Sequence, residues 1–346
     1  MSDLASLAGR RIALIGGAGF IGHHLAIRLK ELGADVHVVD GLQVNNLLMH
    51  TALPPGTPNR ELHLMVLSQR IERLHEAGVP LHVQDARDYT KLSLLLGELQ
   101  PQVIVHLAAV AHAGKSNKDP MSTFDHSLRT LENALDCARV RAERFVFFSS
   151  SMVYGHFNAE AVTEDHPLDP IGIYGALKLA SERFVIAYRQ VFDLPYTIIR
   201  PSALYGPGCV SQRVSQIFIE SALAGETLRV DGDGDERLDF SYVDDVVDGA
   251  VLSMASPDAE NETFNVTAGR SRTLAELVDL VRQHFPDLEV EYVERDVLRP
   301  YRGTLSIEKA RRLIGFEPRV SLEEGLDRYV AWYRDLVGSP VFAVSS

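Results

Sequence analysis

Two residues of the stretch "YGALK", Tyr174 and Lys178, have side chains that can move a proton. They stand four residues apart in a predicted helix, which places both side chains on one face of that helix. A phenol has a pKa of about 10 and is a poor base at neutral pH, but a neighbouring ammonium group stabilises the phenolate. Tyr174 could then act as a general acid or base. The same pair is also common on solvent-exposed helix faces, so the spacing alone leaves both interpretations open.

The stretch "SSSMVYG", residues 149–155, places three hydroxyl groups directly after the apolar run 145–148. Serines that follow a strand are common turn residues. A hydroxyl at a strand end can also hold the reacting oxygen atom beside Tyr174. The segment therefore offers a partner for the tyrosine without showing which serine it is.

The N-terminal stretch "RIALIGGAGFIGHHLA" has Gly16, Gly19 and Gly22 between a predicted strand and a predicted helix. Glycines there allow a tight turn, close approach of the backbone to a diphosphate, and helix amides that face its negative charge. The next strand ends in Asp40, which can accept hydrogen bonds from an adenosine ribose and would repel a 2′-phosphate. These residues predict NAD rather than NADP. Asp85, after the third strand, is either an adenine contact or a helix N-cap.

Short apolar runs alternate with longer amphipathic stretches in the first half of the chain, as in a parallel sheet covered by helices. Such a sheet binds ligands at the carboxyl ends of its strands. The sequence therefore predicts the α/β class, with a doubly wound parallel sheet of the Rossmann type. The predicted strands are 12–15, 36–39, 81–83, 103–106, 145–148 and 196–199, and the predicted helices lie near 20–32, 61–77, 88–98, 120–140 and 173–191.

The second half is rich in turns and predicts a smaller lobe that is interleaved with the first. We expect an NAD-binding domain over 1–200 and a mainly substrate-binding lobe over 201–340, with some of its segments returning to the first domain. Residues 42–78 resemble an insertion, in which a loop around 54–58 is followed by an added helix.

The formal net charge is -13, which is the opposite of what nonspecific nucleic-acid binding requires. Two cysteines without metal-ligand spacing suggest neither a disulfide framework nor a metal site. The N-terminus lacks the apolar core of a signal peptide, and no apolar run approaches the length of a membrane span. We therefore expect a cytoplasmic protein with no nucleic-acid or membrane partner.

Several motifs together resemble the extended short-chain dehydrogenase/reductase family and, more narrowly, its NAD-dependent nucleotide-sugar epimerases and dehydratases. The resemblance covers nearly the whole chain, and the ordered set is far more specific than any one motif. The motifs are "GGAGFIG", "HLAAVA", "SSSMVYG", "YGALK", "RPSALYGPG", "GDGDERLDFSYVDDV" and "IEKARRLIGFEP".

The resemblance implies roles for individual residues. Ser150 matches the catalytic hydroxyl, Tyr174 the acid/base, and Lys178 the lysine that also binds the nicotinamide ribose. The implied cofactor is NAD, and its implied contacts are Gly16, Gly19, Phe20, Ile21, Gly22, Asp40, Asp85, Ala86, Leu107, Ala108, Ala109, Tyr174 and Lys178.

The implied substrate is a nucleotide-diphosphate sugar, most simply a UDP-sugar. Ser150 and Tyr174 would contact it, and so would Lys115, Ser151, Arg213, Arg237 and Arg302. Arg299 is an alternative to Arg302. The family has an Arg directly before the Asp of "LDF", where this chain has Leu238 and carries Arg237 one place earlier. His112 and Ser116, in the loop 111–120, are further candidates for contact with the sugar.

The residues after Ser150 discriminate among the reactions of the family. Dehydratases carry an Asp–Glu pair there and decarboxylases a Glu, whereas this chain has Ser151 and Met152, neither of which can transfer a proton. We therefore expect 4-epimerisation, by oxidation at C4 to a keto-sugar and re-reduction, on a UDP-hexose or a UDP-uronate. An NAD-dependent dehydrogenase or reductase, a 4,6-dehydratase and a noncatalytic dinucleotide-binding protein are the alternatives.

The resemblance also implies a homodimer, because family members pair two helices of each chain in a four-helix bundle. The corresponding segments here are 120–140 and 173–191. Phe184, Ala187 and Val191 could contribute to such an interface.

Overall fold

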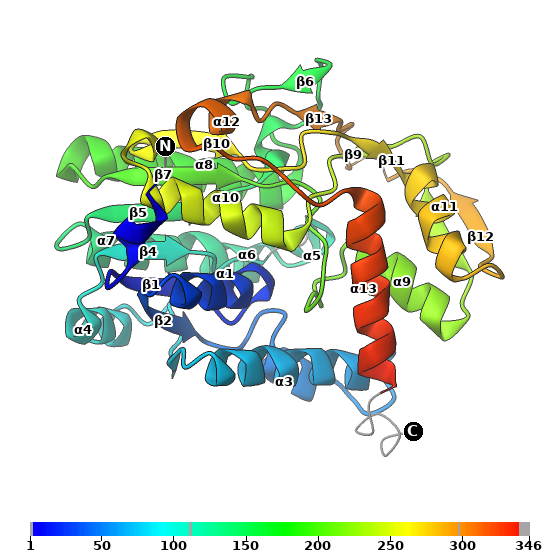
Figure 1. The fold of residues 1–346 in the computed structure, drawn as a ribbon, viewed down its shortest axis with the longest axis horizontal. Helices are drawn as coiled ribbons and strands as arrows, with labels where there is room; N and C mark the ends of the chain where they lie inside the picture. Colours follow the sequence, from blue (N-terminus) through cyan, green and yellow to red (C-terminus); the bar gives the residue numbers. More distant parts are fainter. Residues whose placement is uncertain (1–2, 111–112, 297, 339–346) are drawn as a thin grey trace.

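The computed structural model describes residues 3–110, 113–296 and 298–338. Its centre is a seven-stranded parallel sheet with the strand order β10-β7-β5-β4-β1-β2-β3 (Figure 1). The fold class predicted above is confirmed. The strands are β1 (Arg11–Ile15), β2 (Asp35–Asp40), β3 (Leu81–Val83), β4 (Val103–His106), β5 (Arg144–Phe148), β7 (Tyr196–Arg200) and β10 (Glu262–Asn265).

Helices cover both faces of this sheet. Successive strand residues point to opposite faces, so Ile12 and Leu14 enter one apolar cluster, whereas Ala13 and Ile15 enter the other. α1 (Phe20–Glu31) and α10 (Val243–Ala255) pack on the first face. α4 (Tyr89–Leu99), α7 (Thr130–Ala138) and α8 (Gly172–Phe192) pack on the second. Burial on both faces explains why the strands read as continuous apolar runs rather than alternating ones.

The helix predicted near 120–140 is present over 120–138 but is not a regular α-helix throughout. The segment is divided into α6 (Pro120–Phe124), a π-helical turn (Asp125–Arg129) and α7. Thr130 Oγ1 donates to the carbonyl oxygens of His126 and Ser127, at 3.1 and 3.0 Å. Such bonds from a side chain to the preceding turn compete with the regular helical ladder, and amphipathic spacing does not reveal them.

Residues 42–78 form α2 (Leu47–Thr51), a loop, and α3 (Arg60–Glu76). α3 packs against α1 and crosses the C-terminal helix α13 (Leu322–Val337) (Figure 1). Trp332 Nε1 of α13 donates to Gln69 Oε1 of α3 at 3.1 Å. The stretch is thus folded onto the body of the protein by contacts with distant segments.

The second half of the chain contributes both to a small lobe and to the central sheet. After β7 the chain builds the lobe, and α10 and β10 then return to the layers of the central sheet. The two domains are thus interleaved in sequence, and the predicted boundary at residue 200 stays a prediction. The other elements are the 3-10 turns Leu4–Leu7, Ser151–Tyr154 and Pro257–Ala259, α5 (Ala113–Lys118), β6 (Ala161–Val162), α9 (Val214–Ala224), β8 (Leu228–Asp231), β9 (Arg237–Leu238), β11 (Arg272–Thr273), α11 (Leu274–His284), β12 (Val290–Val293), β13 (Thr304–Leu305) and α12 (Glu308–Ile314).

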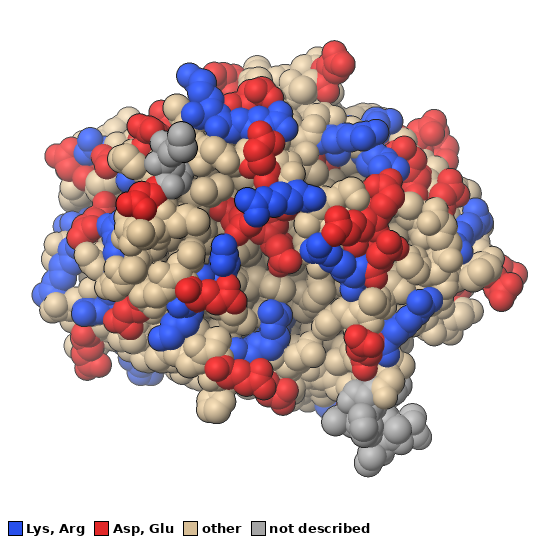
Figure 2. All heavy atoms as spheres, in the orientation of Figure 1, with Lys and Arg blue, Asp and Glu red and all other residues tan. Residues whose placement is uncertain are grey.

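The surface carries charges of both signs. On the face shown in Figure 2, Lys and Arg are interspersed with Asp and Glu rather than gathered into a basic band. None of the helices in the described ranges is long and apolar enough to cross a membrane.

A buried ion pair joins α8 to β7. Arg200 Nε and Nη2 donate to the two carboxylate oxygens of Glu182 at 2.9 and 2.7 Å. Arg200 Nη1 also donates to the Tyr154 hydroxyl at 2.8 Å, and that hydroxyl donates to Asn265 Oδ1 at 2.7 Å. The network connects the carboxyl ends of β5, β7 and β10, which are the strand ends where ligands of such sheets bind.

Glu182→Ala should lower the free energy of unfolding by about 3–5 kcal/mol, because it leaves the buried Arg200 guanidinium without its carboxylate. The matched control is Asp193→Asn, which breaks the Arg189–Asp193 pair on the same helix, where the Asp193 side chain is 92% exposed. An exposed pair contributes about 1 kcal/mol or less. Urea denaturation of both variants measures the difference, and equal losses would contradict the assigned role of Glu182.

Candidate active site

The glycine loop joins β1 to α1. Gly16 has a φ of 80°, which side chains other than glycine rarely adopt. A Cβ atom on Gly16 would lie 2.6 Å from Ala108 N, and one on Gly22 would lie 2.5 Å from Gly17 O. Both positions therefore require glycine because backbone segments touch there. Gly19 is the N-cap of α1, so no capping side chain stands between the first amides of α1 and an anion.

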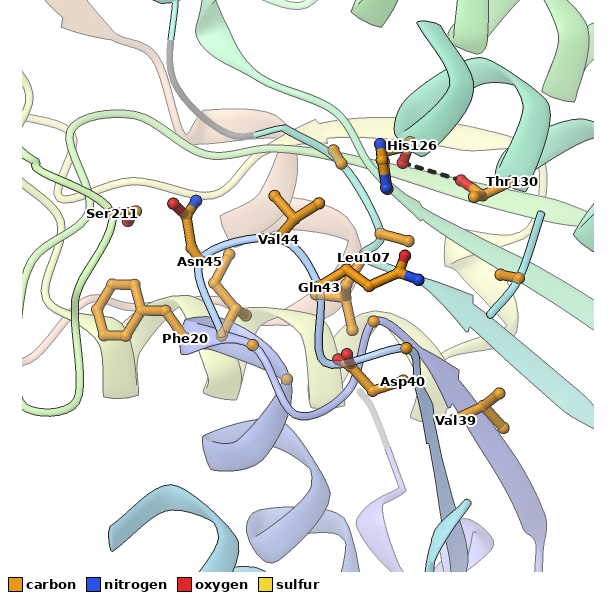
Figure 3. Close-up of a pocket in the computed structure, with 18 of the residues that line it drawn as sticks. Phe20, Val39, Asp40, Gln43, Val44, Asn45, Leu107, His126, Thr130 and Ser211 are labelled. Carbon is orange, nitrogen blue, oxygen red and sulfur yellow. Dashed lines mark hydrogen bonds between the residues drawn. The ribbon is translucent and has the colours of Figure 1, made fainter. Parts of the chain in front are cut away.

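A cavity lies next to this loop at the carboxyl ends of β1, β2 and β4, and we call it the glycine-loop cavity (Figure 3). The structure brings together there all the residues predicted to bind the cofactor except Tyr174 and Lys178. These lining residues are Gly16, Gly19, Phe20, Ile21, Gly22, Asp40, Asp85, Ala86, Leu107, Ala108 and Ala109. Other lining residues were not singled out from the sequence, namely Val39, Gly41, Gln43, Val44, Asn45, Arg70, Gln84, His126, Thr130 and Ser211.

Asp40 is the last residue of β2 and points into the glycine-loop cavity (Figure 3). Its two carboxylate oxygens accept hydrogen bonds from the backbone N–H groups of Ala18, at 3.0 Å, and Leu42, at 2.7 Å. Burial raises the pKa of Asp40, and these hydrogen bonds oppose that effect. The carboxylate is thus fixed between the glycine loop and the loop after β2, with lone pairs left for ribose hydroxyls.

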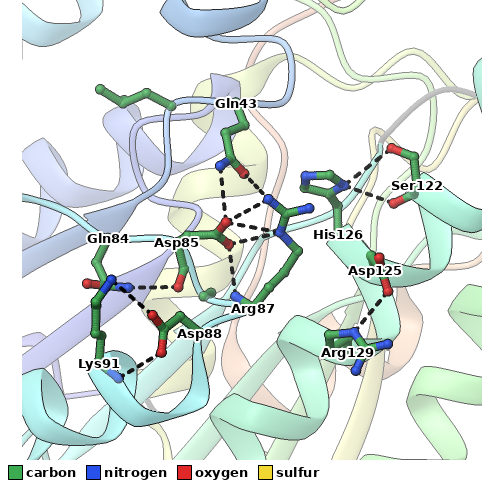
Figure 4. A network of polar contacts seen from close by, with 12 residues as sticks. Gln43, Gln84, Asp85, Arg87, Asp88, Lys91, Ser122, Asp125, His126 and Arg129 are labelled. Atoms are coloured by element: carbon green, nitrogen blue, oxygen red, sulfur yellow. Dashed lines mark hydrogen bonds and ion pairs between the residues drawn. The ribbon is translucent and has the colours of Figure 1, made fainter.

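Asp85 is held by a polar network at the rim of the same cavity (Figure 4). Its carboxylate accepts from Arg87 Nη2 at 2.6 Å, from Arg87 Nε and from Gln43 Nε2. Burial disfavours the charged form, but these hydrogen bonds lower the pKa of Asp85 to about 2. The alternative role as a helix N-cap does not hold, because Asp88 is the N-cap of α4.

A second cavity contains the predicted proton-transfer residues, and we call it the tyrosine cavity. Ser150, Tyr174 and Lys178 all line it. It shares five lining residues with the glycine-loop cavity, so the two cavities adjoin. The shared residues are Ile21, Leu107, Ala109, Ser211 and Arg213.

Tyr174 and Ser150 meet where the start of α8 faces the end of β5. Burial raises the pKa of the Tyr174 hydroxyl, whereas the charge of Arg213 and a hydrogen bond with Ser150 lower it. Ser150 also caps the turn that follows it, because its Oγ accepts from Met152 N at 3.2 Å. The turn therefore orients the Ser150 hydroxyl toward the tyrosine.

Lys178 lies one helical turn after Tyr174 and is buried. Its Nζ donates to the carbonyl oxygen of Phe148 at 2.6 Å. Burial lowers the pKa of Lys178 to about 7, although the nearby Glu182 opposes the decrease. The Lys178 amine can therefore exchange a proton near neutral pH, and pKa values shifted in this way are typical of functional sites.

The two serines beside Ser150 have separate contacts. Ser149 Oγ donates to Glu182 and so belongs to the buried ion-pair network. Ser151 Oγ donates to Ser202 Oγ at 3.1 Å, and Ser151 lines the tyrosine cavity with Met152. Neither of the two residues directly after Ser150 carries a carboxylate, so the cavity wall has no acidic side chain at those two positions.

The predicted arginines are placed differently. Arg213 and Arg302 line the tyrosine cavity, and Arg302 pairs with Glu236 at 3.5 Å. Arg299 lines it as well and pairs with Asp231. The structure does not bring Arg237 to this cavity, since its guanidinium donates to the hydroxyl and the carbonyl oxygen of Ser271.

Of the candidates in the loop 111–120, Lys115 lies toward the glycine-loop cavity. Its Nζ donates to Asn45 Oδ1 at 3.2 Å, and Asn45 lines that cavity. Ser116 is buried. His112 falls outside the residues that the structure describes.

The model of the NAD dependent epimerase/dehydratase family matches residues 12–267. The chain belongs to this family. It is therefore an NAD-dependent enzyme, and the matched segment contains the glycine loop, Asp40 and the Ser150–Tyr174–Lys178 set.

Three similar proteins extend the match to nearly the whole chain. The UDP-glucose 4-epimerase of Mycolicibacterium smegmatis is 33% identical over 341 residues, which are 94% of this chain and 99% of that protein. The crystal structure of Thermotoga maritima UDP-glucose 4-epimerase with UDP-glucose is 29% identical, with a TM-score of 0.81, and covers 94% and 99% of the two chains. The Thermus thermophilus UDP-glucose 4-epimerase in complex with NAD is 27% identical, with a TM-score of 0.80 and the same coverage.

The residues of this family member fit NAD. The close backbone approach at Gly16 and the amides at the start of α1 suit the diphosphate, and the Asp40 carboxylate suits the adenosine ribose. When bound, NAD supplies hydride transfer. Tyr174 and Lys178 lie in the adjoining cavity, so the chain can remove a proton from a substrate hydroxyl close to the cofactor.

Some of the unpredicted lining residues of the glycine-loop cavity could have been inferred from their position in the sequence, and others could not. Gln43 and Asn45 lie three and five residues after Asp40, so the loop after a ribose-binding acidic residue could have been inferred to line the site. Arg70 and His126 belong to helical segments with no motif, and only their tertiary contacts bring them to the cavity.

Gly22→Ala should weaken NAD binding by about five- to a hundredfold, because overpacking of about 1–3 kcal/mol would displace the glycine loop. Its new methyl group would meet the backbone of Gly17. Gly97→Ala on α4 is the matched control, because a Cβ there meets no atom within 4 Å. The NAD content of each purified variant and calorimetric titration with NAD measure the effect. Unchanged NAD affinity in Gly22→Ala would contradict the proposed geometry.

Proposed function

We propose that this protein is an NAD-dependent 4-epimerase of a nucleotide-diphosphate sugar, with a UDP-hexose or a UDP-uronate as substrate. The observation that carries the proposal is the position of Ser150, Tyr174 and Lys178 in a cavity adjoining the glycine-loop cavity, next to the non-acidic Ser151 and Met152. Ser150, Tyr174 and Lys178 provide for proton transfer next to the proposed hydride acceptor. Ser151 and Met152 provide no carboxyl group for an additional acid–base step.

The acidic residues of the tyrosine cavity support this assignment. Asp231, Glu236 and Asp296 line the cavity, and each lies within 4.0 Å of an arginine of the segment 299–302. Elimination of water or loss of carbon dioxide from the sugar would use a carboxyl group beside the reacting carbon. The acids here are engaged with cations that suit a diphosphate instead.

The proposed reaction conserves the cofactor. Tyr174 takes the proton of the C4 hydroxyl, Ser150 holds that oxygen, and Lys178 stabilises the phenolate. The hydride of C4 passes to NAD, which leaves a 4-keto sugar. The hydride then returns to the opposite face of C4 and Tyr174 returns the proton, so configuration inverts and no net oxidation occurs.

Arg213 and Arg302 are the proposed diphosphate partners. The Arg302 side chain is 19% exposed, and its partial burial lowers the pKa of the guanidinium. Its Nε has no hydrogen-bond partner among the described residues, and the same holds for Arg213 Nε. Arginines whose buried Nε donors are unused are suited to a doubly charged diphosphate. The names of the Mycolicibacterium and Thermotoga relatives support a UDP-sugar.

The purified protein should interconvert UDP-glucose with its C4 epimer, or UDP-glucuronate with its C4 epimer, without added NAD. NMR of the product measures the change of configuration at C4, and absorbance of NADH in the same reaction measures any net oxidation. Tyr174→Phe should lower kcat by about 10²–10⁴-fold, because the acid/base is lost. Tyr188→Phe, on the same helix and outside the tyrosine cavity, is the control.

Two results would contradict this function. NADH that accumulates in proportion to product would indicate a dehydrogenase. Full turnover by Tyr174→Phe would mean that Tyr174 is not the acid/base.

We further propose a homodimer formed through α8 and the neighbouring α6. On α8, Phe184 and Val191 are 42% and 70% exposed, and on α6, Met121 and Phe124 are 79% and 42% exposed. Phe184, Ala187 and Val191 recur at helical spacing, so they share one face. Apolar patches of this kind mark interfaces between protein chains.

The double variant Phe184→Glu, Val191→Glu should be monomeric, because carboxylates would be buried against their own symmetry mates. Light scattering after gel filtration measures the mass. Tyr292→Glu, at an exposed position on β12, should leave the mass unchanged. A wild-type protein that runs as a monomer would refute the dimer.

A further inference from the structure

α3, in the segment 42–78, brings one arginine to the wall of the glycine-loop cavity. Arg70 lines this cavity and is only 2% exposed. Its Nε donates to the carbonyl oxygen of Gly208 at 2.7 Å. Its Nη1 makes longer contacts with the carbonyl oxygens of Ala18, at 3.5 Å, and Asn45, at 3.4 Å. Arg70 is thus held by backbone rather than by an acidic side chain.

The three carbonyl groups belong to three separate segments that meet at Arg70, and Asn45 lines the cavity. Ala18 lies in the glycine loop, Asn45 in the loop after β2, and Gly208 in the segment between β7 and α9. Gly208 itself has a φ of 82°, and a Cβ there would lie 2.9 Å from the His23 ring. The carbonyl that receives the shortest Arg70 bond is therefore fixed by close packing.

The charge of Arg70 lacks a paired carboxylate. Among the described residues, none of the ion pairs within 4.0 Å includes Arg70, and its Nη2 has no hydrogen-bond partner. Burial lowers the pKa of Arg70 to about 10, an effect that Asp40 partly opposes. A buried cation of this kind gains stability from an anion brought next to it.

The cavity has few cations with which to receive an anion. Arg70 and Arg213 are the only Lys or Arg side chains among the described residues that line it. The NAD diphosphate brings two negative charges into a protein whose net charge is -13. The glycine-loop amides alone supply partial charges, whereas a guanidinium supplies a full charge and a planar set of donors.

We propose that Arg70 binds the NAD diphosphate, and that α3 thereby acts as an element that retains the cofactor. The unused Nη2 donors reach the anion while Nε and Nη1 keep the guanidinium fixed to the three segments. Bound NAD is then connected through one side chain to the glycine loop and to the segment that precedes α9. The inference depends on NAD as the cofactor and not on the sugar or the reaction.

Arg70→Gln and the matched Arg60→Gln, which removes a charge from the same helix outside the cavity, test this proposal. Calorimetry on NAD-free protein gives affinities for NAD, for ADP-ribose, which has the diphosphate, and for adenosine, which has no phosphate. Arg70→Gln should weaken NAD and ADP-ribose by about ten- to a hundredfold, the size expected for a hydrogen bond to a charged group. Adenosine affinity should stay unchanged, and Arg60→Gln should match the wild type for all three ligands.

The deciding quantity is the ratio of ADP-ribose affinity to adenosine affinity. A ratio that falls in Arg70→Gln supports the proposal, whereas an unchanged ratio overturns it, because a purely structural role would weaken both ligands equally. Arg70→Lys provides the same test if Arg70→Gln does not fold. Lysine keeps the charge but lacks the planar fork of donors, so the ratio should fall by a smaller factor, and an unchanged ratio again overturns the proposal.

Discussion

The Glu182–Arg200 ion pair is the interaction on which the geometry of the active site depends. It holds α8 against β7, and α8 carries Tyr174 two turns and Lys178 one turn before Glu182. Because Arg200 occupies both carboxylate oxygens, Glu182 is not a free counterion for Lys178. The lysine is instead bound by the carbonyl oxygen of Phe148, and its pKa falls to about 7. One buried contact thus influences both the position and the protonation of the proton-transfer residues.

The glycine-loop cavity contains the residues proposed to bind NAD, and the tyrosine cavity contains the residues proposed to transfer the proton. Ile21 and Leu107 belong to both walls, at the point where the strand order reverses between β1 and β4. A parallel sheet opens a crevice at that point because its crossover helices leave in opposite directions. Hydride transfer requires the cofactor and substrate to meet there, and Tyr174 lines the substrate side. The family relationship and the sheet topology therefore both support the proposed site of the reaction.

Many features of the site could be predicted from the sequence because they depend on neighbours along the chain. The glycine loop and Asp40 follow from a strand, a turn and a helix start, and the spacing of Tyr174 and Lys178 follows from one helical face. Predictions failed where the position of a side chain depends on a segment that is distant in the sequence. Arg237 lies near a diphosphate motif in sequence, yet its guanidinium is taken up by Ser271, which a different strand region brings to it.

The sequence by itself determined the α/β class, the cofactor loop and the proton-transfer set, because apolar periodicity and glycine or acidic residues at strand ends act over short chain distances. The resemblance had already named Ser150 among the three serines. Only the tertiary structure decided that Ser149 binds Glu182 and Ser151 binds Ser202, and that residues 42–78 bring Arg70 to the cofactor cavity. Arg70 meets Gly208 across 138 positions of the chain. Such a contact arises from the packing of whole elements, which no local pattern encodes.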